Sequence, residues 1–113
     1  MAFNDIESQL IKRDIDAFMA KRRPPPHMRH ELDLGYRVDG QSIVIFEVRT
    51  VWQGRPDEKM EHAVAKITYV RTKKIWMVYW MRANLKWYQY EPAKTIEAAL
   101  AVVAADENCC FFG

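Results

Sequence analysis

The first twenty residues carry apolar side chains at a helical period. Asn4 and Glu7 have the spacing of a capping box, in which two side chains satisfy free amide groups at a helix start. The triple proline at 24–26 ends the pattern, because proline has no amide hydrogen to donate. We therefore predict a helix over residues 5–21, followed by a short stiff linker. Its apolar positions are Ile6, Leu10, Ile11, Ile15, Phe18 and Met19.

From residue 32 the pattern changes to period two, which is typical of a strand with one buried face. Apolar residues at 32, 34, 36 and 38 alternate with polar residues and glycine. Asp39-Gly40 is a strong signal for a two-residue turn, and residues 42–52 continue as a long strand. The pattern predicts a β-hairpin in which Asp33 lies opposite Phe46.

Residues 58–70 fit two patterns. A helix would gather Met60, Ala63, Val64 and Ile67 on one face, whereas a strand would alternate at positions 65, 67 and 69. Ile, Thr, Tyr and Val cluster at the end of the segment, and no helix-ending glycine follows. We therefore predict a strand over residues 64–71, with a turn at 71–74.

Six of the fourteen aromatic residues lie between Ile75 and Tyr90. Aromatic and β-branched side chains suit a pleated surface, so we predict strands over residues 75–82 and 86–91 around a tight connection at 82–85. Thr95 is placed to cap a final helix with apolar residues at 96, 99, 100 and 103. The apolar tail that contains Phe111 is expected to dock against the body.

These elements predict an α+β fold in a single domain over residues 1–113. It comprises an N-terminal helix, a five-stranded mainly antiparallel sheet and a C-terminal helix, and the sheet is a hairpin joined to a three-stranded meander. Half of the residues are hydrophobic, which excludes a disordered chain.

Two-residue turns in the meander would sort its side chains onto two faces. Two short helices can cover one face of such a sheet. The other face either stays open, as contiguous apolar patches at binding sites do, or is covered by the N-terminal helix or the tail. The predicted core face holds Ala65, Ile67, Tyr69, Trp76, Val78, Trp80 and Trp87. The predicted opposite face holds Lys66, Thr68, Val70, Ile75, Met77, Tyr79, Met81, Lys86, Tyr88 and Tyr90.

The formal charge of +2 is unevenly distributed along the chain. Residues 21–94 carry fifteen Lys or Arg against eight Asp or Glu, whereas both ends are acidic. A nucleic-acid-binding domain normally has a stronger basic excess. Cys109 and Cys110 are adjacent and cannot link distant elements, so we expect reduced thiols in a cytoplasmic protein. No apolar run approaches the ~20 residues of a membrane span, and we expect no membrane association.

Several local sequences resemble a known family. They are the proline-rich linker, VAKITY at 64–69, WMVYW at 76–80, KW at 86–87 and the Phe112-Gly113 end. Together they resemble short bacterial proteins catalogued as a domain of unknown function, and the resemblance covers nearly the whole chain. It implies a strand at 64–71, which the family places just after a proline, where this chain has Ala63. The family brings no known activity and therefore implies no functional residue.

The predicted opposite face leads to two binding hypotheses. The first is a protein interface, most simply a two-fold homodimer, because interface cores favour Tyr, Trp, Met and Arg. The second is single-stranded nucleic acid, with Tyr residues stacking on bases and basic residues following phosphates. No glycine-aromatic RNA-binding motif is present, so we favour the protein interface. Its candidate binding residues are Lys66, Met77, Tyr79, Lys86, Tyr88 and Tyr90.

An enzymatic hypothesis rests on Asp33 and Glu47, which resemble the carboxylates of divalent-metal nucleases. Arg49 stands where such sites use a lysine, and arginine does not release its proton at neutral pH. The predicted hairpin also directs Asp33 and Glu47 to opposite faces. We therefore expect an exposed Glu47–Arg49 pair.

No other chemistry-bearing pattern stands out in the sequence. His27, His30 and His62 lack zinc-site spacing, so we expect solvated loop histidines. Ser8 and Ser42 lack the context of a nucleophile. We expect no catalytic residue, no metal and no cofactor.

Overall fold

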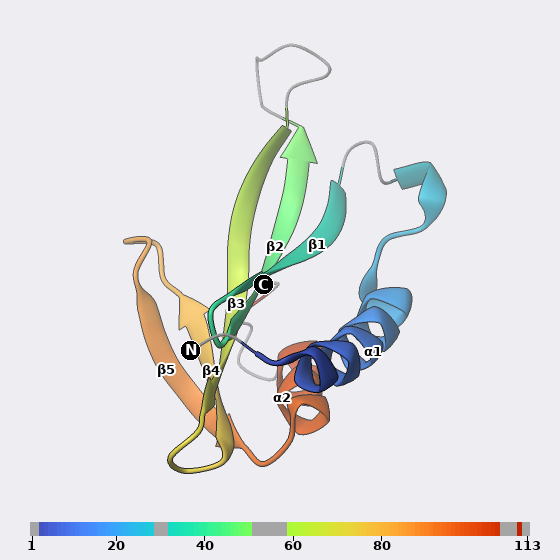
Figure 1. The fold of residues 1–113 in the computed structure, drawn as a ribbon. Helices are drawn as coiled ribbons and strands as arrows, with labels where there is room; N and C mark the ends of the chain where they lie inside the picture. Colours follow the sequence, from blue (N-terminus) through green and yellow to red (C-terminus); the bar gives the residue numbers. More distant parts are fainter. Residues whose placement is uncertain (1–2, 29–31, 51–58, 107–110, 112–113) are drawn as a thin grey trace.

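The computed structural model describes residues 3–28, 32–50, 59–106 and 111. A long helix comes first, five strands follow, and a second helix comes after the last strand (Figure 1). This order confirms the predicted α+β fold. The elements are α1 (Asp5–Arg22), the short 3₁₀ helix η1 (Pro26–Met28), β1 (Leu32–Asp39), β2 (Ser42–Thr50), β3 (Lys59–Val70), β4 (Ile75–Met81), β5 (Trp87–Ala93) and α2 (Ile96–Ala105).

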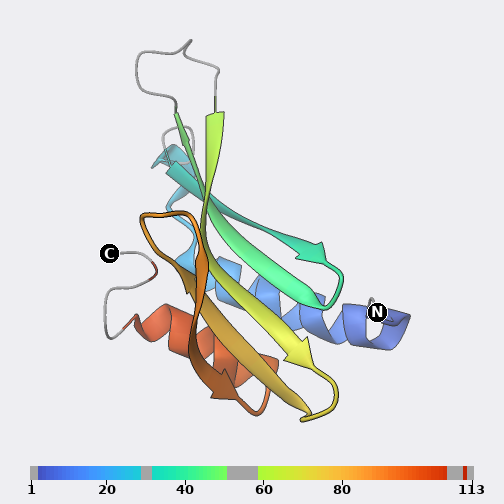
Figure 2. The same cartoon turned by 90° about the vertical axis from the view of Figure 1, so that its left-hand side faces the viewer.

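The five strands form one antiparallel sheet in the order β1-β2-β3-β4-β5. Both helices lie on the same side of this sheet (Figures 1 and 2). Their apolar stripes meet the inner side chains of the strands in one core, so only one face of the sheet is covered by helices. The buried core residues are Ile11, Ile15, Phe18, Ile43, Ile45, Val64, Ala65, Ile67, Trp76, Val78, Ile96, Ala99, Leu100, Val103 and Phe111.

The hairpin between β1 and β2 has its turn one residue later than predicted. Asp39 pairs with Ser42, and Gly40 adopts a φ of +59°, which glycine reaches without strain. Asp33 consequently lies opposite Val48 instead of Phe46. This shift of two positions keeps the alternation of faces, so Asp33 still points away from Glu47. Residues 51 and 52 of the predicted strand lie outside the described residues.

Strand β3 begins at Lys59, five residues before the predicted start, which excludes a helix over this segment. Its pairing with β2 contains a bulge, because Ile45 pairs with Ala65 while Phe46 pairs with Ala63. Val64 is the additional residue, and both Val64 and Ala65 are buried. Two consecutive inward residues break the period of two and bring Met60, Val64 and Ile67 to one side, whereas Ala63, the fourth member of the apparent helical face, points to the other side.

The connection between β4 and β5 is a three-residue loop instead of the predicted two-residue turn. The Arg82 amide donates to the Lys86 carbonyl at 3.2 Å, and Leu85 has a φ of 63°. A left-handed third residue is typical of such loops, although leucine rarely adopts it. Because the loop is one residue longer, the side chains of β5 reverse faces: Trp87 pairs with Met81, and Tyr88 pairs with Trp80.

A second bulge lies in the pairing of β4 with β5. Val78 pairs with Glu91 and Tyr79 with Gln89, which leaves Tyr90 as the additional residue. The Tyr90 ring packs edge-on against Phe111 at 5.1 Å and joins the core. The predictions that Trp87 faces the core and that Tyr88 and Tyr90 face away from it are therefore wrong. The other predicted core-face residues of β3 and β4 are confirmed.

Both predicted helix caps are present. The Asn4 side chain accepts a hydrogen bond from the Glu7 backbone amide at 2.8 Å, and the Glu7 carboxylate accepts one from the Asn4 backbone amide at 3.0 Å. Thr95 Oγ1 accepts the Ala98 amide at 3.0 Å. The predicted apolar stripe of α1 is only partly buried, because Ile6 is 73% exposed and Leu10 is 48% exposed.

Glu7 also joins α1 to the sheet. Arg71, in the turn between β3 and β4, donates two hydrogen bonds to the Glu7 carboxylate, at 2.9 and 3.1 Å. These bonds, with the bond from the Asn4 amide, hold the pKa of Glu7 below its ordinary value of 4.5.

This lowered pKa predicts how stability depends on pH. The ionised Glu7 stabilises the folded chain above its unfolded pKa of 4.5, and this stabilisation is lost as the pH falls through the lower folded value. Glu7→Gln retains a side-chain oxygen that can accept the Asn4 amide hydrogen bond and removes the charge. We expect the free energy of unfolding of the wild type to fall more steeply below about pH 5 than that of Glu7→Gln. Urea titrations at several pH values measure both, and parallel profiles would contradict the role of the charge.

Candidate functional site

The face of the sheet opposite α1 and α2, which we call the helix-free face, is a candidate binding surface. Strand pairing fixes its members, because side chains directly opposite one another point to the same side. Val44 is buried among its strand neighbours, the other apolar and central members are half-buried, and the members at the edges are exposed. The buried and half-buried members of the helix-free face are Ser42, Val44, Phe46, Val48, Ala63, Lys66, Thr68, Val70, Ile75, Met77, Tyr79, Met81 and Trp87, and its exposed members include Arg37, Glu61, Gln89 and Pro92.

Lys66 lies in the middle of the helix-free face, between two aromatic rings. Its Nζ is 4.8 Å from the Tyr79 ring centroid and 5.3 Å from the Trp87 ring centroid. A cation near the face of a ring gains roughly 0.5–2 kcal/mol, depending on how far water is excluded. Within the described part of the chain, Lys66 has no carboxylate partner. The two rings therefore hold an ammonium group whose charge is not neutralised.

A second aromatic arrangement covers the β1 side of the same face. The Phe46 ring lies over Gly35, where an added Cβ would come within 2.7 Å of Phe46 Cε2. The Arg37 guanidinium stands 5.6 Å from the Phe46 centroid and forms an ion pair with Glu61 at 3.3 Å. Glycine at position 35 thus makes room for a cross-strand aromatic ring.

The six predicted binding residues do not form one cluster. Lys66, Met77 and Tyr79 lie together on the helix-free face, as predicted. Tyr88 and Tyr90 lie on the opposite face, and Lys86 is exposed beside the loop that ends β4. Val44, Phe46 and Trp87 were missed. The alternation in residues 42–50 marks Val44 and Phe46 as outward residues, whereas Trp87 depends on a loop length that the sequence does not signal.

Tyr88 belongs to a separate aromatic group near the end of β4. The Arg82 guanidinium stands 4.8 Å from the Trp80 centroid and 4.2 Å from the Tyr88 centroid. Asn84 Nδ2 donates to the Tyr88 hydroxyl at 2.8 Å. These contacts brace the hairpin loop, so Tyr88 has a structural role on the other side of the sheet from Lys66.

Asp33 and Glu47 do not converge. Arg23 binds both oxygens of Asp33, at 2.6 and 2.7 Å, and this pairing raises the pKa of Arg23. Glu47 projects from the opposite face and accepts a hydrogen bond from Arg49 at 3.1 Å. Contrary to the expectation of an exposed pair, Glu47 is only 8% exposed. Its place on the inner side of the sheet, beside Leu34 and His62 in the register, accounts for this burial.

The described residues contain no group of three His, Cys, Asp or Glu side chains that could hold a metal ion. His27 is exposed in η1. His62 is exposed on β3 and not in a loop, because β3 begins earlier than predicted. His30, Cys109 and Cys110 lie outside the described residues.

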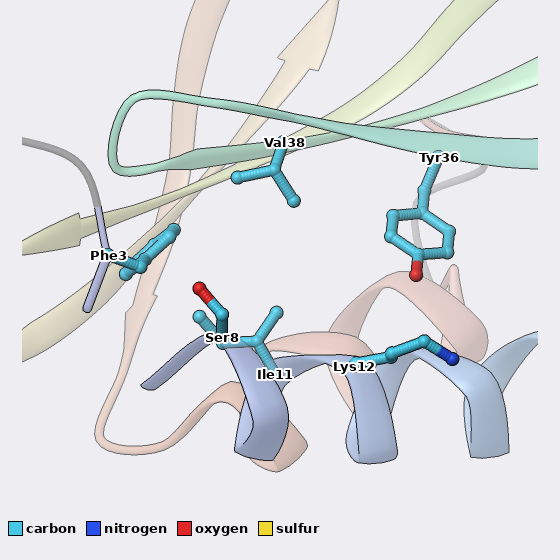
Figure 3. A pocket seen from close by; sticks show the side chains of 6 residues that line it. All are labelled: Phe3, Ser8, Ile11, Lys12, Tyr36 and Val38. Carbon is cyan, nitrogen blue, oxygen red and sulfur yellow. The ribbon is translucent and has the colours of Figure 1, made fainter. Parts of the chain in front are cut away.

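A small cavity lies between α1 and β1 (Figure 3). Its volume is about 40 Å³, enough for one or two water molecules but far below the roughly 300–1,000 Å³ of small-molecule sites. No histidine or carboxylate lines it beside Ser8, and the Lys12 ammonium that also lines it is paired with Asp16 at 3.0 Å. The lining residues are Phe3, Ser8, Ile11, Lys12, Tyr36 and Val38. This cavity offers no site for substrate chemistry.

One comparison with known proteins agrees with the resemblance seen in the sequence. No helix within the described ranges combines the length and the apolar character that crossing a membrane requires. No curated protein and no solved structure matches the chain. A protein family described as a domain of unknown function, DUF3024, matches residues 3–113. The chain therefore belongs to the DUF3024 family.

Proposed function

We propose that the chain is a non-catalytic association module that binds a second copy of itself through the helix-free face. The observation that supports this proposal best is the placement of both helices and Phe111 on the other face of the sheet. Within the described residues, no helix packs against the helix-free face. An apolar and aromatic face of this extent usually marks an association site.

Two such faces fit the known geometry of sheet packing. Sheets stack about 10 Å apart, and their inner side chains interdigitate. Met77, Tyr79 and Trp87 belong to the residue types enriched in interface cores. A specific dimer buries roughly 600 Å² or more on each copy, and burial contributes about 25 cal/mol per Å² of apolar surface before the costs of association.

Lys66 is compatible with such an interface. Its methylene chain is apolar, and the rings of Tyr79 and Trp87 already take the place of part of the water around its ammonium group. The charge nevertheless makes full burial costly unless a carboxylate or water stays near it. We therefore expect a carboxylate of the second copy or a water molecule to lie beside the Lys66 ammonium within the contact.

Sedimentation equilibrium across micromolar to hundred-micromolar concentrations tests this proposal. We expect reversible association, together with slower oxidative labelling of Met77 and Trp87 as the concentration rises. A clean monomer at tens of micromolar would overturn it. Association without any change in the oxidative labelling of Met77 and Trp87 would also overturn it.

Single-stranded nucleic acid is a second candidate, because Lys66 and Arg37 share the helix-free face with aromatic rings. Two of the three tyrosines in the original hypothesis lie on the other face, however, and the Tyr79 ring already contacts Lys66. If strands bind here, Tyr79→Ala should lose roughly 1–3 kcal/mol of binding free energy and Tyr88→Ala almost none. The absence of binding to a mixed oligonucleotide at low salt would discard this candidate.

A further inference from the structure

A groove of about 600 Å³ runs between α1 and α2, on the outer side of the helices. In Figure 2 the two helices cross the sheet in the same direction. The floor of the groove is apolar, because Phe18 and Leu100 lie at its base beside three alanines, Ala17, Ala101 and Ala104. Such small side chains let another helix approach to the usual interaxial distance of about 8–10 Å.

Charged residues stand at both ends of the groove. Glu97 also lines the neighbouring hollow with Leu10, which places it at the end nearer the start of α1. Lys21 lies eight residues after Arg13, about 12 Å further along the helix. Arg13 and Asp14 form an ion pair with each other at 3.6 Å. Lys21 and Glu97 are both exposed and have no ion-pair partner within the described part of the chain.

This distribution of charge is complementary to itself under two-fold symmetry. Consider a two-fold axis that lies in the plane of contact and crosses the groove at a right angle. Rotation about this axis reverses the direction of the groove, so the Lys21 end of one copy meets the Glu97 end of the other. The same contact forms twice, once on each side of the axis. Between the two contacts, the apolar floors of the two grooves face each other.

We propose that the groove between α1 and α2 is a second self-association surface, where two copies pack their helix pairs antiparallel and Lys21 of each pairs with Glu97 of the other. This proposal is independent of the helix-free face, because the two surfaces lie on opposite sides of the sheet. A chain with two different two-fold surfaces assembles beyond a dimer, either into a closed tetramer or into an open row.

Charge reversal tests this pairing. The measurements use the full chain carrying Met77→Asp, which removes association through the helix-free face; Trp87→Arg replaces this change if the first variant does not fold. We expect these chains still to form dimers. Lys21→Glu or Glu97→Lys alone should weaken the dimer about tenfold or more, because each contact occurs twice. The double reversal should restore the wild-type dissociation constant to within about threefold.

The double variant also separates pairing from an effect on the helices themselves. Lys21 lies in the last turn of α1 and Glu97 in the first turn of α2, where helix dipoles favour these charges. If the dipoles alone mattered, the two reversals would add and the double variant would be the weakest. Circular dichroism of each variant checks that its helices are retained.

Three results would overturn the groove proposal. They are a monomer in the Met77→Asp background at hundred-micromolar concentration, single reversals without effect, and a double variant no tighter than the singles. If Met77→Asp dissociates the chain completely, the helix-free face alone mediates association. If only the charge reversals change association, the groove proposal stands and the function proposed for the helix-free face is wrong.

Discussion

Met77→Asp is expected to weaken association through the helix-free face about a thousandfold. Met77 lies on β4 in the middle of this face and is half-buried before any partner binds. Burying an unpaired carboxylate in an apolar contact costs at least about 2 kcal/mol, and a two-fold interface contains the substitution twice. A total of about 4 kcal/mol corresponds to a thousandfold increase in the dissociation constant. The concentration dependence of oxidative labelling at Trp87 in both proteins measures this ratio, because Trp87 lies on the helix-free face and not in the groove.

Met60→Asp is the matched control. Met60 lies on β3, is 52% exposed, and points to the opposite side of the sheet from Met77. The control introduces the same charge into the same sheet and should leave the dissociation constant unchanged. Equal weakening by both substitutions would show that net charge, and not the helix-free face, controls association.

Ile15→Ala is expected to lower the free energy of unfolding by about 2–5 kcal/mol. Ile15 lies in the middle of α1 with none of its surface exposed, so its truncation removes buried apolar contacts and leaves a cavity. Domains of this size are commonly stable by only about 5–15 kcal/mol. The midpoint of thermal unfolding should therefore fall by on the order of 10 °C. Urea and thermal denaturation measure both quantities.

Ile6→Ala provides the comparison within the same helix. Ile6 is 73% exposed, and the substitution changes helix propensity in the same direction as Ile15→Ala. It should alter the free energy of unfolding by less than about 0.5 kcal/mol. A similar loss for both variants would mean that α1 packs against the sheet by a different face.

Much of the fold could be predicted because local chemistry determined it. The Asn4 and Glu7 pair marked the start of α1, and Thr95 marked the start of α2. The turn between β3 and β4 preserved the predicted alternation, so Lys66, Met77 and Tyr79 were correctly placed on one face. These features depend on residues that are close in the sequence.

The remaining errors come from single-residue changes in register. Leu85 adopts a left-handed conformation that is rare for leucine, so nothing in the sequence distinguished a three-residue loop from a two-residue turn. The additional residues at Val64 and Tyr90 are bulges, which depend on packing between strands. One shifted residue moved Trp87 onto the candidate site and removed Tyr88 from it. Ion pairs such as Arg23–Asp33 require the tertiary structure and had no signal in the sequence.

The contact between Glu7 and Arg71 also has a consequence for the order of folding. The two residues are 64 positions apart in the chain, whereas the three hairpins pair neighbouring segments. Closing a long loop costs more entropy than closing a short one, so the hairpins should form first and the docking of α1 should come late. Ile15→Ala should accordingly accelerate unfolding more than it slows refolding, which stopped-flow kinetics can measure. A folding chain would then expose the apolar side of its sheet until its first helix docks onto it.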